Sequence, residues 1–246
     1  GYSSYPWAPD WRRFKQIAEA VGAYLLADIA HIAGPIAAGV LPSPVGIADV
    51  VTFTTHKSLC GPRGAVVLTH LQKLAEKLDR AVFPGEQGGP HMNTIAAQAV
   101  TFRLAATQEF RELQAQILAN CKALNDSLAA AGLRIPFGGT DTHLTNVDCS
   151  TIRGPDGTAL SGDQAARILD LAGIVVNRNT IPGDTTAARA SGIRLGTVWV
   201  TQRGFGIRES EQLAGLIAQL LQAGTPFGLP GRADPMPRVK VDFDVL

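Results

Sequence analysis

The sequence contains little charge, few cysteines and no long apolar run. Only 17% of its 246 residues are charged, the formal net charge is +1, and lysines and arginines form no dense block, so we predict no nucleic-acid partner. Because no apolar run reaches the roughly 18 residues that a membrane span needs, we also predict no membrane partner. Cys60, Cys121 and Cys149 lack metal-ligand spacing, so we predict no metal site and expect free thiols in a reducing compartment, the cytoplasm.

Hydrophobic residues, in contrast, make up 46% of the chain, enough for a sizeable core. Asp10 predicts the start of a helix over 11–21, Gly22 ends it, and a short apolar strand over 23–27 leads into Asp28. A helix, a glycine, an apolar strand and an acid at the strand's carboxyl end are typical of an α/β unit. In open parallel sheets, ligands bind outside those carboxyl ends, which makes Asp28 a candidate site residue.

The stretch from Asp49 to Leu68 predicts a strand, a polar loop and a second strand. The first strand, over 47–55, leads into Lys57, and the second covers 65–68. A lysine is unexpected at the end of a buried strand, because its hydrated cation is costly to bury, unless it has a chemical role. One such role is a Schiff base with a carbonyl group, which a lysine forms once burial or neighbouring cations lower its pKa.

The remaining sequence alternates helices, strands and loops. In chain order we predict a helix over 70–78, a glycine-rich loop over 83–90, a helical stretch over 92–130 interrupted near Thr107, a strand over 142–150, a helix over 161–172 capped by Ser161, strands over 174–177 and 191–200, and a helix over 209–223. The tail, 224–246, holds several prolines and predicts loose structure. We therefore divide the chain into an α/β part, 1–105, and a smaller α+β part, 106–246.

Asp28 and Lys57 end consecutive predicted strands, so we expect their side chains to converge over one cleft. Alone, Asp28 has two interpretations: a cap for the following helix, or an anionic partner for a protonated ring nitrogen. Pyridoxal phosphate needs such a partner, so that its ring acts as an electron sink, together with a lysine that binds it covalently. The joint occurrence of the two residues favours a pyridoxal-phosphate site.

Three further features each have a structural and a functional interpretation. His31 and His56 are either satisfied core or loop histidines, or residues that contact a cofactor or transfer protons. Gly88–Gly89 is either a turn or a phosphate-binding loop of backbone N–H groups. Arg194, inside an apolar strand, forms either a structural ion pair or a clamp for a carboxylate.

Six segments, in the same order along the chain, resemble segments of serine hydroxymethyltransferase, also called glycine hydroxymethyltransferase. They are DIAHIAGPIAAGVLPSP (Asp28–Pro44), VVTFTTHKSLCGPRG (50–64), FPGEQGGPHMNTIAAQA (83–99), GGTDTHL (138–144), VNRNTIPGD (176–184) and SGIRLGT (191–197). The resemblance implies a pyridoxal-phosphate-dependent transferase of fold type I. Residues 1–105 would be the second half of its large domain, a mostly parallel sheet with helices, and residues 106–246 its small α+β domain with a proline-rich tail. It also implies a homodimer with active sites at the subunit interface, or a tetramer.

The resemblance implies a role for several residues around the cofactor. Lys57 matches the Schiff-base lysine, and Asp28 matches the partner of the pyridine nitrogen. Ser3 and His31 match residues near the cofactor's phenolic oxygen. Thr54 matches a threonine implicated in exchanging the cofactor between lysine and substrate.

Further matches concern the rim of the site and the substrates. His56 precedes the lysine as in the family, and Arg63 matches an active-site arginine. Gly88–Gly89 matches glycines that contact the phosphate of the neighbouring subunit's cofactor. Arg194 matches the clamp for the substrate carboxylate, and Asn179 matches a residue that contacts folate.

The implied reaction is the interconversion of L-serine and glycine, with transfer of the hydroxymethyl carbon to tetrahydrofolate. Trp199 stands where the family usually has alanine, and the loop 185–190 lacks the lysine, proline and phenylalanine common in the family. These departures leave open an aldolase or transaldolase that acts on another β-hydroxy amino acid. The start, GYSSYPW, has no initiator methionine and no signal peptide and suggests a fragment without the first part of the large domain. A third alternative is therefore an inactive piece that needs a complementary N-terminal chain.

Overall fold

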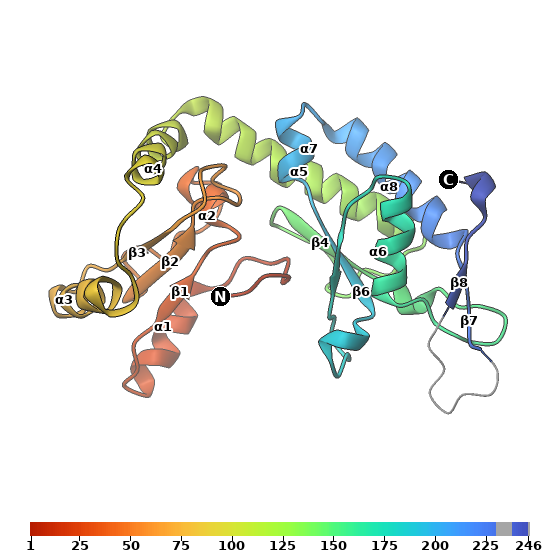
Figure 1. The fold of residues 1–246 in the computed structure, drawn as a ribbon, viewed down its shortest axis with the longest axis horizontal. Helices are drawn as coiled ribbons and strands as arrows, with labels where there is room; N and C mark the ends of the chain where they lie inside the picture. The colour runs from red at the N-terminus through yellow and green to blue at the C-terminus, as the bar shows by residue number, and fades with distance from the viewer. Residues whose placement is uncertain (230–237, 246) are drawn as a thin grey trace. The chain divides into compact units, whose positions relative to one another are not determined.

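The computed structural model describes residues 1–229 and 238–245. The chain forms two compact units: unit 1 comprises Gly1–Ser3 and Ala8–Ala115, and unit 2 comprises Ser4–Trp7 and Gln116–Leu246. Both units combine helices with small sheets (Figure 1), which confirms the predicted α/β character. Within the described ranges, no helix has both the length and the apolar character needed to cross a membrane.

Unit 1 is built around a three-stranded sheet. Its elements are α1 (Trp11–Ala20), β1 (Leu26–Asp28), α2 (Ala33–Ala37), β2 (Val50–Thr54), β3 (Ala65–Leu68), α3 (Gln72–Arg80), a π-helical turn (Ala81–Glu86) and α4 (Met92–Ala105). The strand order is β1-β2-β3. β1 and β2 run parallel, so their last residues, Asp28 and Thr54, lie at the same edge of the sheet.

The third strand of unit 1 corrects one expectation. The sheet was predicted to be mostly parallel, but β3 pairs antiparallel with β2, with Thr54 opposite Ala65. The reason is the short connection of ten residues between these two positions: parallel neighbours need a crossover of a dozen or more residues. β3 therefore begins at the same edge at which β1 and β2 end.

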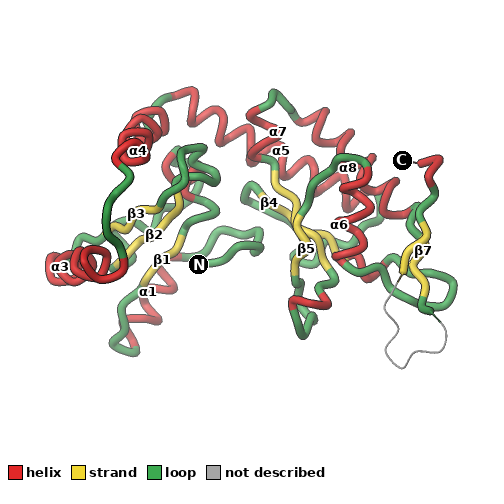
Figure 2. The backbone as a smooth tube through the Cα atoms, viewed as in Figure 1, coloured by secondary structure: helices red, strands yellow, loops and turns green. Residues whose placement is uncertain are grey.

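Unit 2 contains two further small sheets (Figure 2). Its elements are the end of α5 (Gln108–Ala130), β4 (Leu144–Asp148), α6 (Gly162–Leu171), β5 (Asn177–Asn179), β6 (Gly192–Gly196), α7 (Val198–Gln202), α8 (Ile207–Gln222), β7 (Thr225–Phe227), β8 (Arg238–Lys240) and short 3-10 turns at Cys149–Thr151, Ala187–Arg189 and Phe243–Val245. The order β4-β6-β5 is antiparallel throughout. α5 starts in unit 1 and continues into unit 2.

Each unit has its own apolar core. In unit 2, α5, α6 and α8 pack against one face of the β4-β6-β5 sheet and bury residues such as Leu169, Ile193 and Ile217. In unit 1 the core lies around β1, β2 and α2. An ion pair joins α1 to this core: Lys15 Nζ lies 2.8 Å from Asp49 Oδ1, and Leu25 N donates to Asp49 Oδ2 over 2.7 Å.

Local signals in the sequence located several helix ends correctly. Asp10 caps α1 by accepting a hydrogen bond from Arg13 N. Ser161 caps α6 in a capping box with Gln164, because both side chains satisfy N–H groups that the first turn leaves free. The predicted interruption near Thr107 is confirmed, since α4 ends at Ala105 and α5 begins at Gln108.

Other expectations are wrong. The segment between β1 and β2 contains a short, buried helix, α2, which was not predicted. The strand predicted over 191–200 ends at Gly196, and α7 follows, so Trp199 lies on a helix and is 74% exposed. Part of the tail is ordered rather than loose, because β7 pairs with β8; three of its prolines, Pro230, Pro235 and Pro237, lie outside the described residues.

Two leucines of α6 allow a matched test of the unit 2 core. Leu169 is 0% exposed and Leu171 is 63% exposed. Leu169→Ala should lower the free energy of unfolding by about 2–5 kcal/mol, because it leaves a cavity. Leu171→Ala should change it by less than about 0.5 kcal/mol. Urea denaturation followed by circular dichroism would measure both; similar losses in the two variants would contradict this description of the core.

Candidate active site

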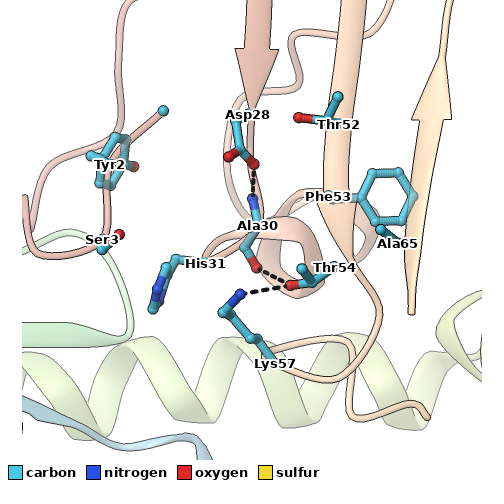
Figure 3. Close-up of a pocket in the computed structure, with 11 residues that line it drawn as sticks. Tyr2, Ser3, Asp28, Ala30, His31, Thr52, Phe53, Thr54, Lys57 and Ala65 are labelled. Atoms are coloured by element: carbon cyan, nitrogen blue, oxygen red, sulfur yellow. Dashed lines mark hydrogen bonds between the residues drawn. The ribbon is translucent and has the colours of Figure 1, made fainter. Parts of the chain in front are cut away.

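A cavity of about 500 Å³ lies at the edge of the unit 1 sheet where β1 and β2 end. The N-terminal loop, β1, β2, β3 and the turn after β2 form its walls (Figure 3). Its lining residues are Gly1, Tyr2, Ser3, Asp28, Ala30, His31, Thr52, Phe53, Thr54, Lys57 and Ala65. Five predicted site residues, Ser3, Asp28, His31, Thr54 and Lys57, therefore come together in one cavity.

Lys57 is half-buried, and a hydroxyl group holds its amine. The Nζ atom donates a hydrogen bond of 3.0 Å to Thr54 Oγ1. Thr54 Oγ1 in turn donates to the carbonyl oxygen of Ala30 over 3.4 Å, as Figure 3 shows. This chain of bonds links the lysine at the end of β2 to the segment that follows β1. Lys57 also lines the cavity.

Asp28 lies across the cavity from Lys57 (Figure 3). One carboxylate oxygen accepts a hydrogen bond of 3.0 Å from Ala30 N, two residues further on. Gly1 lies directly against this side chain: a Cβ on Gly1 would be 2.6 Å from Asp28 Cβ. Asp28 thus has a local structural bond, although not to α2, and still contributes to the cavity wall.

Thr55 closes the turn that carries Lys57. This fully buried residue uses all its polar groups: its N–H donates to Gly64 O over 3.0 Å, its carbonyl accepts from Gly61 N over 2.8 Å, and its hydroxyl donates to Pro62 O over 2.6 Å. Only glycine fits at position 61, because a Cβ there would lie 2.9 Å from Thr55 O. The two ends of the turn are therefore fixed to each other.

Two residues that sequence reasoning missed hold the other side of this turn. Ser58 is 1% exposed; its Oγ accepts from Gly34 N over 3.0 Å and donates to His31 O over 2.8 Å. Gln114, on α5, donates to Ser58 O over 2.8 Å. The position of Ser58 directly after the lysine was a usable signal, but nothing local to Gln114 indicates this contact.

Four other predicted site residues of unit 1 do not line this cavity. His56 is half-buried, and its Nδ1 has no hydrogen-bond partner within residues 1–229 and 238–245. Arg63 is exposed at the turn. Gly88–Gly89 lies in an exposed loop, where a Cβ on either residue would meet nothing within 4 Å.

The two predicted substrate-binding residues belong to unit 2. Arg194 is half-buried in the middle of β6, and burial lowers the pKa of its guanidinium. Asn179 ends β5. Asp184 fastens the loop between these strands by accepting hydrogen bonds of 2.9 Å from both Ile181 N and Ser191 N. Burial alone would raise the pKa of Asp184, but the bonds from Ser191 and Ile181 outweigh it and lower the pKa.

The groups in the cavity suit a small ligand with a carbonyl group and a basic ring nitrogen. Cavities of several hundred Å³ hold ligands of this size. A primary amine such as that of Lys57 can condense with a carbonyl group, and a carboxylate such as that of Asp28 can pair with a protonated nitrogen. Ser3 and Thr52 add hydroxyl groups to the wall.

Comparison with known proteins gives a consistent result. A family model described as serine hydroxymethyltransferase matches residues 1–217. The chain is 47% identical over 226 residues to serine hydroxymethyltransferase of Nitrosospira multiformis, covering 92% of this chain and 53% of that protein. It is 50% identical over 224 residues to serine hydroxymethyltransferase 2 of Ralstonia nicotianae, covering 91% and 51%. The chain thus spans about half the length of the curated relatives it matches.

Removing the Ser58 hydroxyl should loosen the Lys57 turn. Ser58→Ala leaves Gly34 N–H and the His31 carbonyl without their buried partner, so we expect a loss of about 1–3 kcal/mol in the free energy of unfolding. The control is Ser43→Ala, at an exposed residue whose hydroxyl accepts from Val45 N; its effect should stay within about 0.5 kcal/mol. Urea denaturation measures both, and equal effects would contradict the anchoring role of Ser58.

Proposed function

This chain belongs to the serine hydroxymethyltransferase family, and we propose that it carries the cofactor-lysine site for the interconversion of L-serine and glycine with tetrahydrofolate as the carbon acceptor. The observation that carries the proposal is the pairing of Lys57 and Asp28 across one cavity. Family membership also supports fold type I for the protein. The site roles, the division near residue 105 and the cytoplasmic location stay predictions.

The residues of the cavity fit pyridoxal phosphate. Lys57 would hold it covalently through Nζ, and Asp28 would hold the ring nitrogen in its protonated form. Ser3 and His31 would lie near its phenolic oxygen. When bound, pyridoxal phosphate supplies a conjugated ring that accepts the electron pair of the breaking Cα–Cβ bond.

The protein's own groups would perform the remaining tasks. Thr54 holds the Lys57 amine in place, which supports its proposed part in releasing and recapturing that amine. Arg194 would bind the substrate carboxylate through its two-pronged fork and so fix the orientation of the bond to be broken. Asn179 would contact tetrahydrofolate. His56 and Arg63 would act from the rim of the site.

An exposed apolar helix supports the proposed homodimer. α4 exposes five large apolar residues, Met92, Ile95, Val100, Phe102 and Leu104. A helix of this kind is normally covered. A second subunit would cover it, and Gly88–Gly89, just before the helix, would then reach that subunit's cofactor. The same contact is compatible with a tetramer built from dimers.

The lysine assignment is tested by an absorbance spectrum of the purified chain with added pyridoxal phosphate. We expect a visible band that the free cofactor lacks, because a lysine-bound cofactor has an extended conjugated system. Lys57→Ala should abolish the band, whereas Lys73→Ala, which removes an exposed lysine of α3, should keep it. A band that persists in Lys57→Ala would show that another amine binds the cofactor. No band in the unmodified chain would show that this chain alone does not form the site.

The acceptor is tested separately by serine cleavage with and without tetrahydrofolate. When tetrahydrofolate is added, we expect the rate of glycine formation to rise at least tenfold. A rate increase on the order of tenfold or more is typical when a second reactant is held in position next to the first. Cleavage that is equally fast without it would favour the aldolase alternative, which the exposed Trp199 and the altered loop 185–190 leave open. No cleavage under either condition, despite a Lys57-dependent absorbance band, would mean that the chain binds cofactor but needs a complementary chain for activity.

A further inference from the structure

A row of polar side chains crosses the β4-β6-β5 sheet on the face that points away from the unit 2 core. Arg194 of β6 lies directly opposite Asn146 of β4 and Asn177 of β5. Directly opposite residues of antiparallel strands point to the same face of the sheet. Their strand neighbours Val147 and Ile193 point to the other face, where both are fully buried in the core. Arg194 is therefore flanked by two amide side chains.

Asn146 is the unusual member of this row. It is 1% exposed, and its Nδ2 donates a hydrogen bond of 2.7 Å to the carbonyl oxygen of Ser4. Because only the nitrogen of the amide can donate to a carbonyl, this bond fixes the orientation of the side chain. The Oδ1 atom is buried and has no hydrogen-bond partner in the described part of the chain. A buried acceptor of this kind is costly unless a donor reaches it.

Arg194 lies directly opposite Asn146 on the neighbouring strand and carries donors that can reach this oxygen. The Cβ atoms of directly opposite residues lie roughly 5 Å apart, and a guanidinium carries five N–H groups on a long stem. Arg194 is half-buried, so its positive charge gains from a nearby acceptor. Of the two amides that flank Arg194, Asn177 is exposed to water and Asn146 is buried.

We propose that Asn146 is a positioning residue for Arg194. When two N–H groups of the guanidinium bind the carboxylate of an amino-acid substrate, Asn146 Oδ1 accepts one of the others and holds the fork in the orientation that the substrate needs. A neutral amide suits this task, because a carboxylate at position 146 would compete with the substrate for the cation. The inference rests on the proposed function, in which Arg194 is the carboxylate clamp.

The test is nuclear magnetic resonance of the full ¹⁵N-labelled chain, titrated with glycine in the presence of pyridoxal phosphate. It measures the affinity for glycine and the solvent exchange of the Arg194 Nε–H group in the bound state. Asn146→Leu should weaken glycine binding about tenfold or more and speed the exchange, because a hydrogen bond to a charged group is lost. Asn146→Asp should slow the exchange yet also weaken binding, since its carboxylate pairs with Arg194.

Thr145→Val is the matched control for Asn146→Leu. Thr145 is the next residue on β4, is fully buried, points to the opposite face and donates over 2.7 Å to Asn125 Oδ1. Its loss removes a buried hydrogen bond without touching the row, so glycine affinity should stay within about twofold of the unmodified chain. If Thr145→Val and Asn146→Leu lose the same affinity for glycine, general destabilisation of the fold explains the loss, and the proposal is overturned.

Arg194→Ala separates this inference from the function on which it rests. If Arg194→Ala loses glycine binding while Asn146→Leu keeps it, the clamp stands and the positioning role of Asn146 is wrong. If the unmodified chain and Arg194→Ala respond to glycine in the same way, the clamp itself is wrong, and the positioning role fails with it. Loss of binding in both variants, with Thr145→Val unaffected, supports the proposal.

Discussion

The position of Lys57 depends on the hydrogen bonds of Thr55. This residue is fully buried, and its N–H, carbonyl and hydroxyl groups are all bonded within the turn that ends at Gly64. Rotating the turn would leave several buried polar groups without partners, at a cost of about 1–3 kcal/mol for each. The amine two residues later is therefore directed by a part of the chain that cannot easily move.

Ser58 gives the turn a second anchor, of a different kind. Its bonds to Gly34 N and His31 O join the turn to the segment that follows β1, and Gln114 fixes its carbonyl from α5. The same bonds therefore determine where Lys57 lies relative to Asp28. The convergence of the two side chains follows from parallel β1 and β2, but its precision comes from these buried polar contacts.

The sequence predicted the parts of this arrangement that are encoded locally. Asp10 and Ser161 predicted where two helices start. The apolar runs before Asp28 and Lys57 predicted the two strands that bring five predicted site residues into one cavity. Contacts between distant segments were not predictable in this way. Gln114 is 56 residues from Ser58, to which it donates a hydrogen bond. The orientation of the Asn146 amide is set by its hydrogen bond to the carbonyl oxygen of Ser4, which lies far away in the sequence. The pairing of β7 with β8 was missed for a different reason: neither strand is strongly apolar.

The cations of this chain differ in what holds them. Lys15 and Arg134 bind the buried carboxylates of Asp49 and Asp148, and these ion pairs use the positive charge to stabilise the fold. The Lys57 amine instead donates a hydrogen bond to a neutral hydroxyl, that of Thr54. A neutral oxygen orients a cation without cancelling its charge, so the group stays available to a ligand. In the proposed contact between Asn146 and Arg194, a neutral amide oxygen would likewise orient a cation without cancelling its charge.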